Sequence, residues 1–234
     1  MTTPGKRTPV SSRTRPAKPA LSREWIIAAT LEIMRRDGLQ AATVRRVAQA
    51  LDTGQSSLYA YVANTTELHA AVLDELMGTL PTPGPGDAGA RVRQLVAGYR
   101  DLLLAHPGLA RSALVLRPSG PNTLRFLDTL LGLLTEAGFG DDRAAWTADL
   151  VVLYATALAA EHARPPAGDA TGTGDRAGQA LFEAVRTADV GTYPHLSRLS
   201  AVALGGTPGQ RWAWALDVLL ADVVPTPLSG KDRP

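Results

Sequence analysis

The chain has 234 residues, enough for one large domain or for a small domain joined to a larger one. Hydrophobic residues make up 45% and charged residues 20%, a balance that is ordinary for a globular protein, and the lack of cysteine excludes a disulfide framework, a zinc–thiolate site and a thiol redox sensor. The net charge of +2 is unevenly divided, because residues 1–62 hold ten Lys and Arg against four acids and so carry +6, which leaves −4 on the rest. A basic N-terminal quarter on a mildly acidic body indicates a polyanion-binding head.

The first 20 residues are rich in proline and basic side chains and contain almost nothing that a core could bury. We therefore expect residues 1–20 to form a disordered basic arm. No apolar segment of a secretory signal accompanies these basic residues, and no run approaches the roughly 18 apolar residues of a membrane span. The cytoplasm is the expected compartment.

Residues 21–66 have the pattern of a compact helical domain. Ser22 is the expected N-cap of a first helix, and Gly38 is expected to end it in the left-handed conformation. Thr43 is the expected N-cap of a second helix. The first helix has a core-facing stripe at helical spacing. Its members are Ile26, Ala29, Thr30, Ile33 and Met34.

A tight break at residues 51–54 precedes a very short third helix at about 55–61. Asn64 and Glu67 resemble a capping box for a fourth helix at about 65–79. Three short helices with a tight break before the third are the layout of a helix-turn-helix.

The third helix is crowded with side chains that can bind DNA. Gln can bond adenine through two hydrogen bonds, Ser suits several base edges, and Tyr can reach phosphates. Leu58 and Val62 are expected to anchor this helix on the first two. A polar, solvated turn is the simpler explanation for any one polar residue of the set, but it is a poorer one for all of them. The set consists of Gln55, Ser56, Ser57, Tyr59 and Tyr61.

The stretch LSREWIIAATLEIMRRDGLQAATVRRVAQALDTGQSSLYAYVANTTEL resembles the DNA-binding domain of the TetR family of transcriptional regulators. The resemblance implies that Gln55, Ser56 and Ser57 face bases and that Arg45 also lies at the DNA. It implies a mainly phosphate-holding role for a second group of side chains. This group is Thr43, Tyr59 and Tyr61.

Two positions depart from the pattern of that family. Asp52 stands where the turn usually has glycine, but aspartate tolerates the left-handed region better than most residues. Thr65 stands where a lysine often contacts phosphate at the start of the fourth helix. Hydroxyl and backbone N–H groups there can still bind phosphate, although more weakly. The basic arm is a further candidate to compensate by reaching a neighbouring groove.

Residues 67–228 are expected to form a helical regulatory and dimerisation domain, with a tail at 229–234. Residues 81–89 and 165–175 are read as loops. The segment 120–137 is apolar on two sides, which predicts a helix buried in the middle of a bundle. The expected helices lie near 89–106, 108–115, 120–137, 142–163, 175–188 and 208–222, and no useful strand pattern occurs, so the fold class is all-α.

The stretch HPGLARSALVLRPSGPNTLRFLDTLLGLLTEAGF resembles the C-terminal domain of the tetracycline-repressor branch of that family, and RWAWALDVLLADV resembles its last helix. The resemblance implies a homodimer joined by a four-helix bundle, two helices from each subunit. The apolar stripes on these helices would serve equally as the core of a monomer. The expected interface residues are Leu150, Leu153, Ala157, Trp212, Leu216, Leu219 and Leu220.

The same resemblance places a ligand pocket among the fourth to eighth helices, although each aromatic candidate is also a plausible core residue. Ala113 stands where the tetracycline repressor has its magnesium-binding histidine, and Leu95 replaces a polar drug contact. These changes favour an apolar or aromatic small molecule over tetracycline. The candidate lining residues are Tyr99, Arg117, Asn122, Phe126, Trp146 and Tyr154.

The sequence thus favours a ligand-responsive transcriptional regulator of double-stranded operator DNA, most simply a repressor, with no cofactor or metal. An enzyme is the first alternative, but the chain has no Walker loop, G-x-S-x-G elbow or H-E-x-x-H motif. A helical small-molecule-binding protein without DNA affinity is the second alternative. A salt-dependent DNA-binding assay separates it from a regulator.

Overall fold

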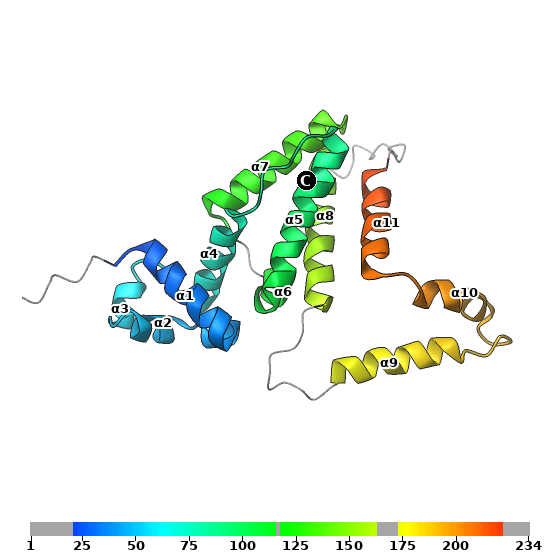
Figure 1. Ribbon diagram of the computed structural model, residues 1–234, viewed down its shortest axis with the longest axis horizontal. Coiled ribbons are helices and arrows are strands. Elements are labelled where there is room, and N and C mark those ends of the chain that lie inside the picture. The colour runs from blue at the N-terminus through cyan, green and yellow to red at the C-terminus, as the bar shows by residue number, and fades with distance from the viewer. Residues whose placement is uncertain (1–20, 116–117, 163–172, 222–234) are drawn as a thin grey trace, which may run out of the picture.

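A computed structural model of the protein describes residues 21–115, 118–162 and 173–221, so the expected arm and tail and Arg117 lie outside the described residues. The described chain is helical and contains no strand, as the sequence predicts. A small head of short helices is joined to a body of longer ones, and α9 and α10 project from the body as a separate pair (Figure 1). The fold class predicted from sequence is therefore confirmed.

The head is built from three helices, a 3-10 turn and the first half of a fourth helix. The Ser22 hydroxyl accepts the N–H of Trp25 at 3.3 Å, and Gly38 ends the first helix with a φ of 84°. The hydroxyl of Thr43 accepts the N–H of Arg46 at 3.3 Å. The two expected side-chain caps are confirmed, and Gly38 ends the first helix with a positive φ, although its ψ of 163° differs from that of the expected left-handed conformation. The elements are α1 (Arg23–Asp37), η1 (Leu39–Ala41), α2 (Val44–Ala50), α3 (Gln55–Leu58) and α4 (Thr65–Met77).

The turn before α3 survives without glycine. Asp52 adopts a φ of 47°, and it is the only non-glycine residue with a positive φ among the residues that the structure describes. The expectation that aspartate would accept this backbone is confirmed. The helix after the turn is shorter than expected, because α3 ends at Leu58 and residues 59–61 form a turn.

Helix α4 connects the two modules. It packs against α1 on the head side and against α5, α6 and α7 on the body side. The expected domain boundary after residue 66 falls inside this continuous helix. Helix α4 is therefore shared between the head and the body.

The body is centred on α5 and α8, which lie side by side and make the most extensive helix–helix contact of the described chain (Figure 1). Among the described residues, α8 alone is long and apolar enough to cross a membrane by length and composition. That composition has a different use here, because α8 packs against α5, α6, α7 and α11. The body helices are α5 (Ala88–Ala105), α6 (Pro107–Ala113), α7 (Pro121–Glu136), α8 (Asp141–His162) and α11 (Pro208–Leu220).

Helix α7 lies at the edge of the body, and the prediction that it is buried all round is wrong. Its neighbours α4, α5 and α8 cover one side, where Phe126, Leu130, Leu133 and Leu134 are buried. The opposite side faces solvent because no described element packs on it. The exposed side chains there are Leu124, Leu127 and Leu131.

The projecting pair consists of α9 (Thr173–Arg186) and α10 (Pro194–Leu204), which contact each other. The sequence reading missed α10. Pro194 occupies the first turn of that helix, where a missing N–H costs nothing and the fixed φ suits the helix.

Helix α11 is attached to the body through one side only. The Trp212 ring stacks on Tyr154 of α8 at a centroid distance of 5.6 Å, and the guanidinium of Arg100 lies 4.5 Å from the Trp212 ring. An ion pair of 2.8 Å between Arg93 of α5 and Asp217 adds a surface contact. No described part of the chain covers the opposite side of α11, where Trp214 and Val218 are exposed.

Candidate DNA-reading head and ligand-binding body

The short helix α3 presents three polar side chains to solvent. Gln55, Ser56 and Ser57 are consecutive and all exposed. Leu58 and Val62 are buried in the core of the head, as the sequence predicts. Because Leu58 and Val62 are buried and α3 packs against α2, the polar turn is held outward. This arrangement suits insertion into a DNA groove.

The two tyrosines beyond α3 are placed differently from each other. Tyr59 is exposed. The hydroxyl of Tyr61 donates a 2.6 Å hydrogen bond to the carbonyl of Leu21, just before α1. The proton that Tyr61 would offer to a phosphate is therefore used within the chain. In this conformation Tyr61 ties the end of the reading turn to the start of α1.

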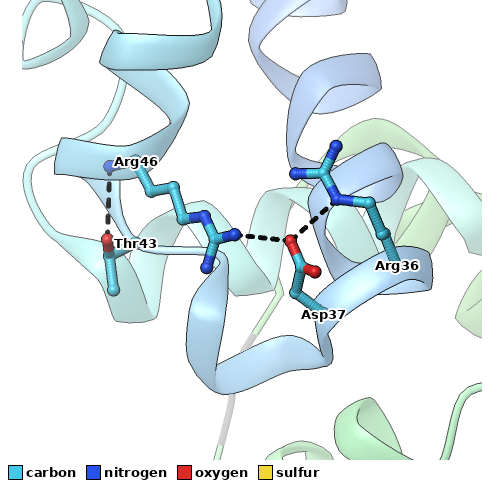
Figure 2. Close-up of polar contacts among 4 residues, drawn as sticks. All are labelled: Arg36, Asp37, Thr43 and Arg46. Atoms are coloured by element: carbon cyan, nitrogen blue, oxygen red, sulfur yellow. Dashed lines mark hydrogen bonds and ion pairs between the residues drawn. The ribbon is translucent and has the colours of Figure 1, made fainter.

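The two arginines at the start of α2 are also in different situations, and Figure 2 shows the contacts of Arg46. The guanidinium of Arg46 lies 2.6 Å from Asp37, whose same carboxylate oxygen accepts Nε of Arg36 at 2.9 Å. Arg45 is exposed and has no ion pair in the described part of the chain. Exposed ion pairs are weak individually, but this one occupies the Arg46 side chain. The charge that remains free at this helix end is that of Arg45.

The start of α4 is tightly capped. Asn64 Oδ1 accepts the N–H of Glu67 at 2.8 Å, as expected from the capping box. Glu67 Oε2 accepts the N–H of Ala63 at 2.6 Å, one residue earlier than a standard capping box. Thr65, the first helical residue, is half-buried and carries no charge.

The expected ligand pocket contains a buried aromatic pair. The rings of Tyr99 on α5 and Phe126 on α7 are 5.2 Å apart between centroids. The hydroxyl of Tyr99 lies 3.1 Å from that of Thr156 on α8. Burial raises the pKa of Tyr99, and the hydrogen bond with Thr156 partly opposes this. A neutral phenol is thus fixed at the junction of three helices.

The other ligand candidates are not gathered at that pair. Tyr154 is half-buried against Trp212, and Asn122 is half-buried at the start of α7, next to Asp74. Trp146 is 56% exposed, so the structure does not bring it to the buried pair. It points outward because α8 buries Ala144, Thr147 and Ala148 instead.

The residues expected at the dimer interface differ in their exposure within the single chain. Leu150 and Leu153 are 48% and 53% exposed, and Ala157 is exposed beside them. Trp212 and Leu216 are instead buried in the body of the single chain, and Leu219 and Leu220 are half-buried. The sequence stripe on α11 therefore marked the side that holds it to α8. The exposed apolar side chains on α11 are Trp214 and Val218, which sequence reasoning missed.

Two buried polar residues of α4 were also missed. The His69 ring lies 2.9 Å from the carbonyl of Ala42, and burial lowers the pKa of His69. Asp74 is 2% exposed and accepts hydrogen bonds from Thr123. The signal in the sequence was that Asp74, the first of two acids between Leu73 and Leu76, lies at a helical phase that should be buried.

The geometry defines a class of protein. A short exposed polar helix, anchored through a tight turn on two others and joined by a shared helix to a larger helical body, is the build of a helix-turn-helix DNA-binding regulator.

Sequence comparisons specify the family. Residues 26–72 match the model described as "Bacterial regulatory proteins, tetR family", and residues 80–222 match "Tetracyclin repressor-like, C-terminal domain". The chain belongs to the TetR family of transcriptional regulators, whose members bind operator DNA and small-molecule ligands and form dimers.

Individual relatives agree with this assignment. The HTH-type transcriptional repressor DrrR1 of Streptomyces coeruleorubidus is 29% identical over 87% of this chain and 80% of its own length. A transcription regulator from Streptomyces coelicolor has a solved structure with 43% identity and a TM-score of 0.75, covering 91% of this chain and 99% of that one. The solved structure of ActR from S. coelicolor in complex with actinorhodin has 30% sequence identity to this chain and a TM-score of 0.73. The match covers 86% of this chain and 96% of ActR. The chain spans about half the length of several other curated regulators that it matches. Together these findings support a ligand-responsive transcriptional repressor.

Proposed function

We propose that this protein is a homodimeric repressor that reads its operator with α3 and leaves it when a small molecule enters the body. The observation that carries the proposal is the exposed turn Gln55–Ser57 on the rigid anchor of Leu58. The site of action is the bacterial cytoplasm, where the operator DNA lies.

The candidate DNA-binding residues of the head fall into two groups in this proposal. Gln55, Ser56 and Ser57 contact base edges, for which their amide and hydroxyl groups are suited. Arg45 contacts phosphate, because its guanidinium is free while that of Arg46 is held by Asp37. A second group positions the head on the DNA backbone through hydroxyl groups. It consists of Thr43, Tyr59 and Thr65, with Tyr61 in a supporting position.

A second copy of the chain covers the exposed faces of α8 and α11. Two half-sites one turn of DNA apart require a twofold protein. Large apolar side chains standing together in solvent mark an interaction surface. The proposed interface is formed by Trp146, Leu150, Leu153, Ala157, Trp214 and Val218, with Leu219 and Leu220 at its inner edge.

The effector is proposed to be an aromatic or largely apolar molecule that displaces packing around Tyr99 and Phe126. Leu95 is buried on the same helix as Tyr99, which makes this part of the body apolar. ActR, the relative bound to actinorhodin, makes actinorhodin the first compound to try. Ligand and operator prefer different arrangements of the head, so each weakens binding of the other.

The direct test is selection of a binding duplex from random DNA, followed by affinity measurements at several salt concentrations. Gln55→Ala is expected to lose about 1–3 kcal/mol of discrimination at one base pair. Arg45→Ala should weaken binding to DNA of every sequence by a similar factor. It should also reduce the slope of log affinity against log salt concentration by about 0.9. Gln179→Ala, at an exposed position on α9, is the matched control. Equal binding by wild type and Gln55→Ala would remove α3 from the reading surface.

A further inference from the structure

Asp74 is a buried acid that neither DNA reading nor the ligand candidates explain. It lies in the second half of α4 and is 2% exposed. Among the described side chains, it is the one buried carboxylate. Aspartate is almost never fully buried unless it is paired, because loss of hydration penalises the charged form.

The partners of Asp74 come from the start of α7. Its Oδ1 accepts the backbone N–H of Thr123 at 2.8 Å and the hydroxyl of Thr123 at 2.7 Å. The N-cap of α7 is Gly120, which has no side chain to cap the free N–H groups. Asp74 therefore caps α7 from another helix, and its negative charge faces the positive end of the α7 dipole.

The two helices approach closely at this point. A Cβ added to Gly120 would collide with the Asp74 carboxylate, and a Cβ added to Gly78 would lie 2.9 Å from the side chain of Asn122. Only glycine fits at either place without displacement. Helices α4 and α7 are therefore in close contact at both glycines.

The first half of α4 is fixed to the head in a similar way. The His69 ring is hydrogen-bonded to the carbonyl of Ala42, just before Thr43 and α2. Leu68 and Val72 are fully buried beside it. A single helix thus carries one buried polar contact to the head and, five residues further on, one to the body.

We propose that the contact of Asp74 with Thr123, here called the Asp74 clasp, transmits the state of the body to the DNA-reading head. The inference rests on the proposed function and adds a positioning residue to it. Hydrogen bonds to a helix N-terminus are directional, so a small rotation of α7 breaks them and releases α4. Asn122, a candidate ligand residue, precedes Thr123 and lies 3.4 Å from the Asp74 carboxylate. A ligand that engages Asn122 acts directly on the clasp.

The test measures whether DNA binding by the head changes the start of α7 in the body, and it does not need the effector. Amide hydrogen exchange of residues 121–126 is measured in the full-length dimer, free and bound to the selected operator duplex. The variants are Thr123→Val, which removes the hydroxyl donor of the clasp, and Thr135→Val on the exposed side of α7. Thr135 donates only to Leu131 of its own helix, so it is the matched control.

Operator DNA is expected to change exchange at residues 121–126 in the wild type and in Thr135→Val, and this change is lost in Thr123→Val. If Thr123→Val does not fold, Thr123→Ala, which also removes the hydroxyl that donates to Asp74, replaces it in the same comparison. The proposal is overturned if operator DNA does not change amide exchange at residues 121–126 in the wild type. It is also overturned if the change is the same in the wild type and in Thr123→Val. A wild type that binds no selected duplex overturns the regulator function itself, and the clasp's role with it.

Discussion

At the scale of single residues, His69 couples the stability of the head to pH. Burial is the main cause that lowers its pKa below the ordinary value of 6.5, and the hydrogen bond to Ala42 only partly opposes this. The unfolded chain therefore binds a proton more readily than the folded one. The contribution of His69 to folding is fully present above pH 6.5 and is lost as the pH falls below that value.

We expect His69→Gln to flatten part of this pH dependence, because the amide can donate to Ala42 without titrating. When the pH is lowered from about 7.5 to about 5, urea unfolding should show a smaller loss of unfolding free energy in the variant than in the wild type. The reason is that the variant has no histidine at this position to take up a proton below about pH 6.5. Part of the dependence should remain, because burial and the charge of Arg35 lower the pKa of His106 as well. His195→Gln, at an exposed position on α10, is the control. Parallel curves for His69→Gln and wild type would contradict the assignment.

At the scale of elements, α11 depends on a complete capping box. The Thr207 hydroxyl accepts the N–H of Gln210 at 3.1 Å, and Gln210 Oε1 accepts the N–H of Thr207 at 2.8 Å. Thr207→Ala should cost about 1 kcal/mol of unfolding free energy. The double variant with Gln210→Ala should lose less unfolding free energy than the sum of the losses in the two single variants, because both residues belong to one motif. Urea unfolding midpoints compare these variants with Thr82→Ala, at an exposed position outside the helices, which should match the wild type.

The helices of the head could be predicted closely because their caps are local. Ser22, Thr43 and Asn64 each accept an N–H three residues on, and this depends only on nearby sequence. The short reading helix was overestimated because Tyr61 is held by Leu21, forty residues earlier. Contacts of this range leave no periodic signal in a sequence.

The orientation of the body helices was less predictable, because apolar periodicity does not state what covers a face. On α11 the stripe with Trp212 and Leu216 was assigned to a partner, but it packs within the chain. On α7 the opposite error occurred, since Leu124 was expected inside and is 59% exposed. Helix α10 was missed because Pro194 was not recognised as a helix start.

At the scale of the whole molecule, the exposed apolar faces predict how the chain assembles. Leu153 is 53% exposed on α8, next to Leu150, and Trp214 is 68% exposed on α11. Leu153→Glu should place a charge in the middle of the proposed interface, where it has no partner and loses its hydration. Sedimentation should show a shift from dimer to monomer. Affinity for the two-half-site operator should fall strongly, while binding to a single half-site should change little.

Leu124→Glu separates assembly from general surface effects. Leu124 has a similar exposure to Leu153 and the same side chain, but it lies on α7, outside the proposed interface. Its variant should remain dimeric and bind the full operator as the wild type does. If both variants become monomeric, the interface extends over α7. If Leu153→Glu stays dimeric, the exposed face of α8 is not the dimer interface, and the spacing of the two reading heads must be set by another surface of the body.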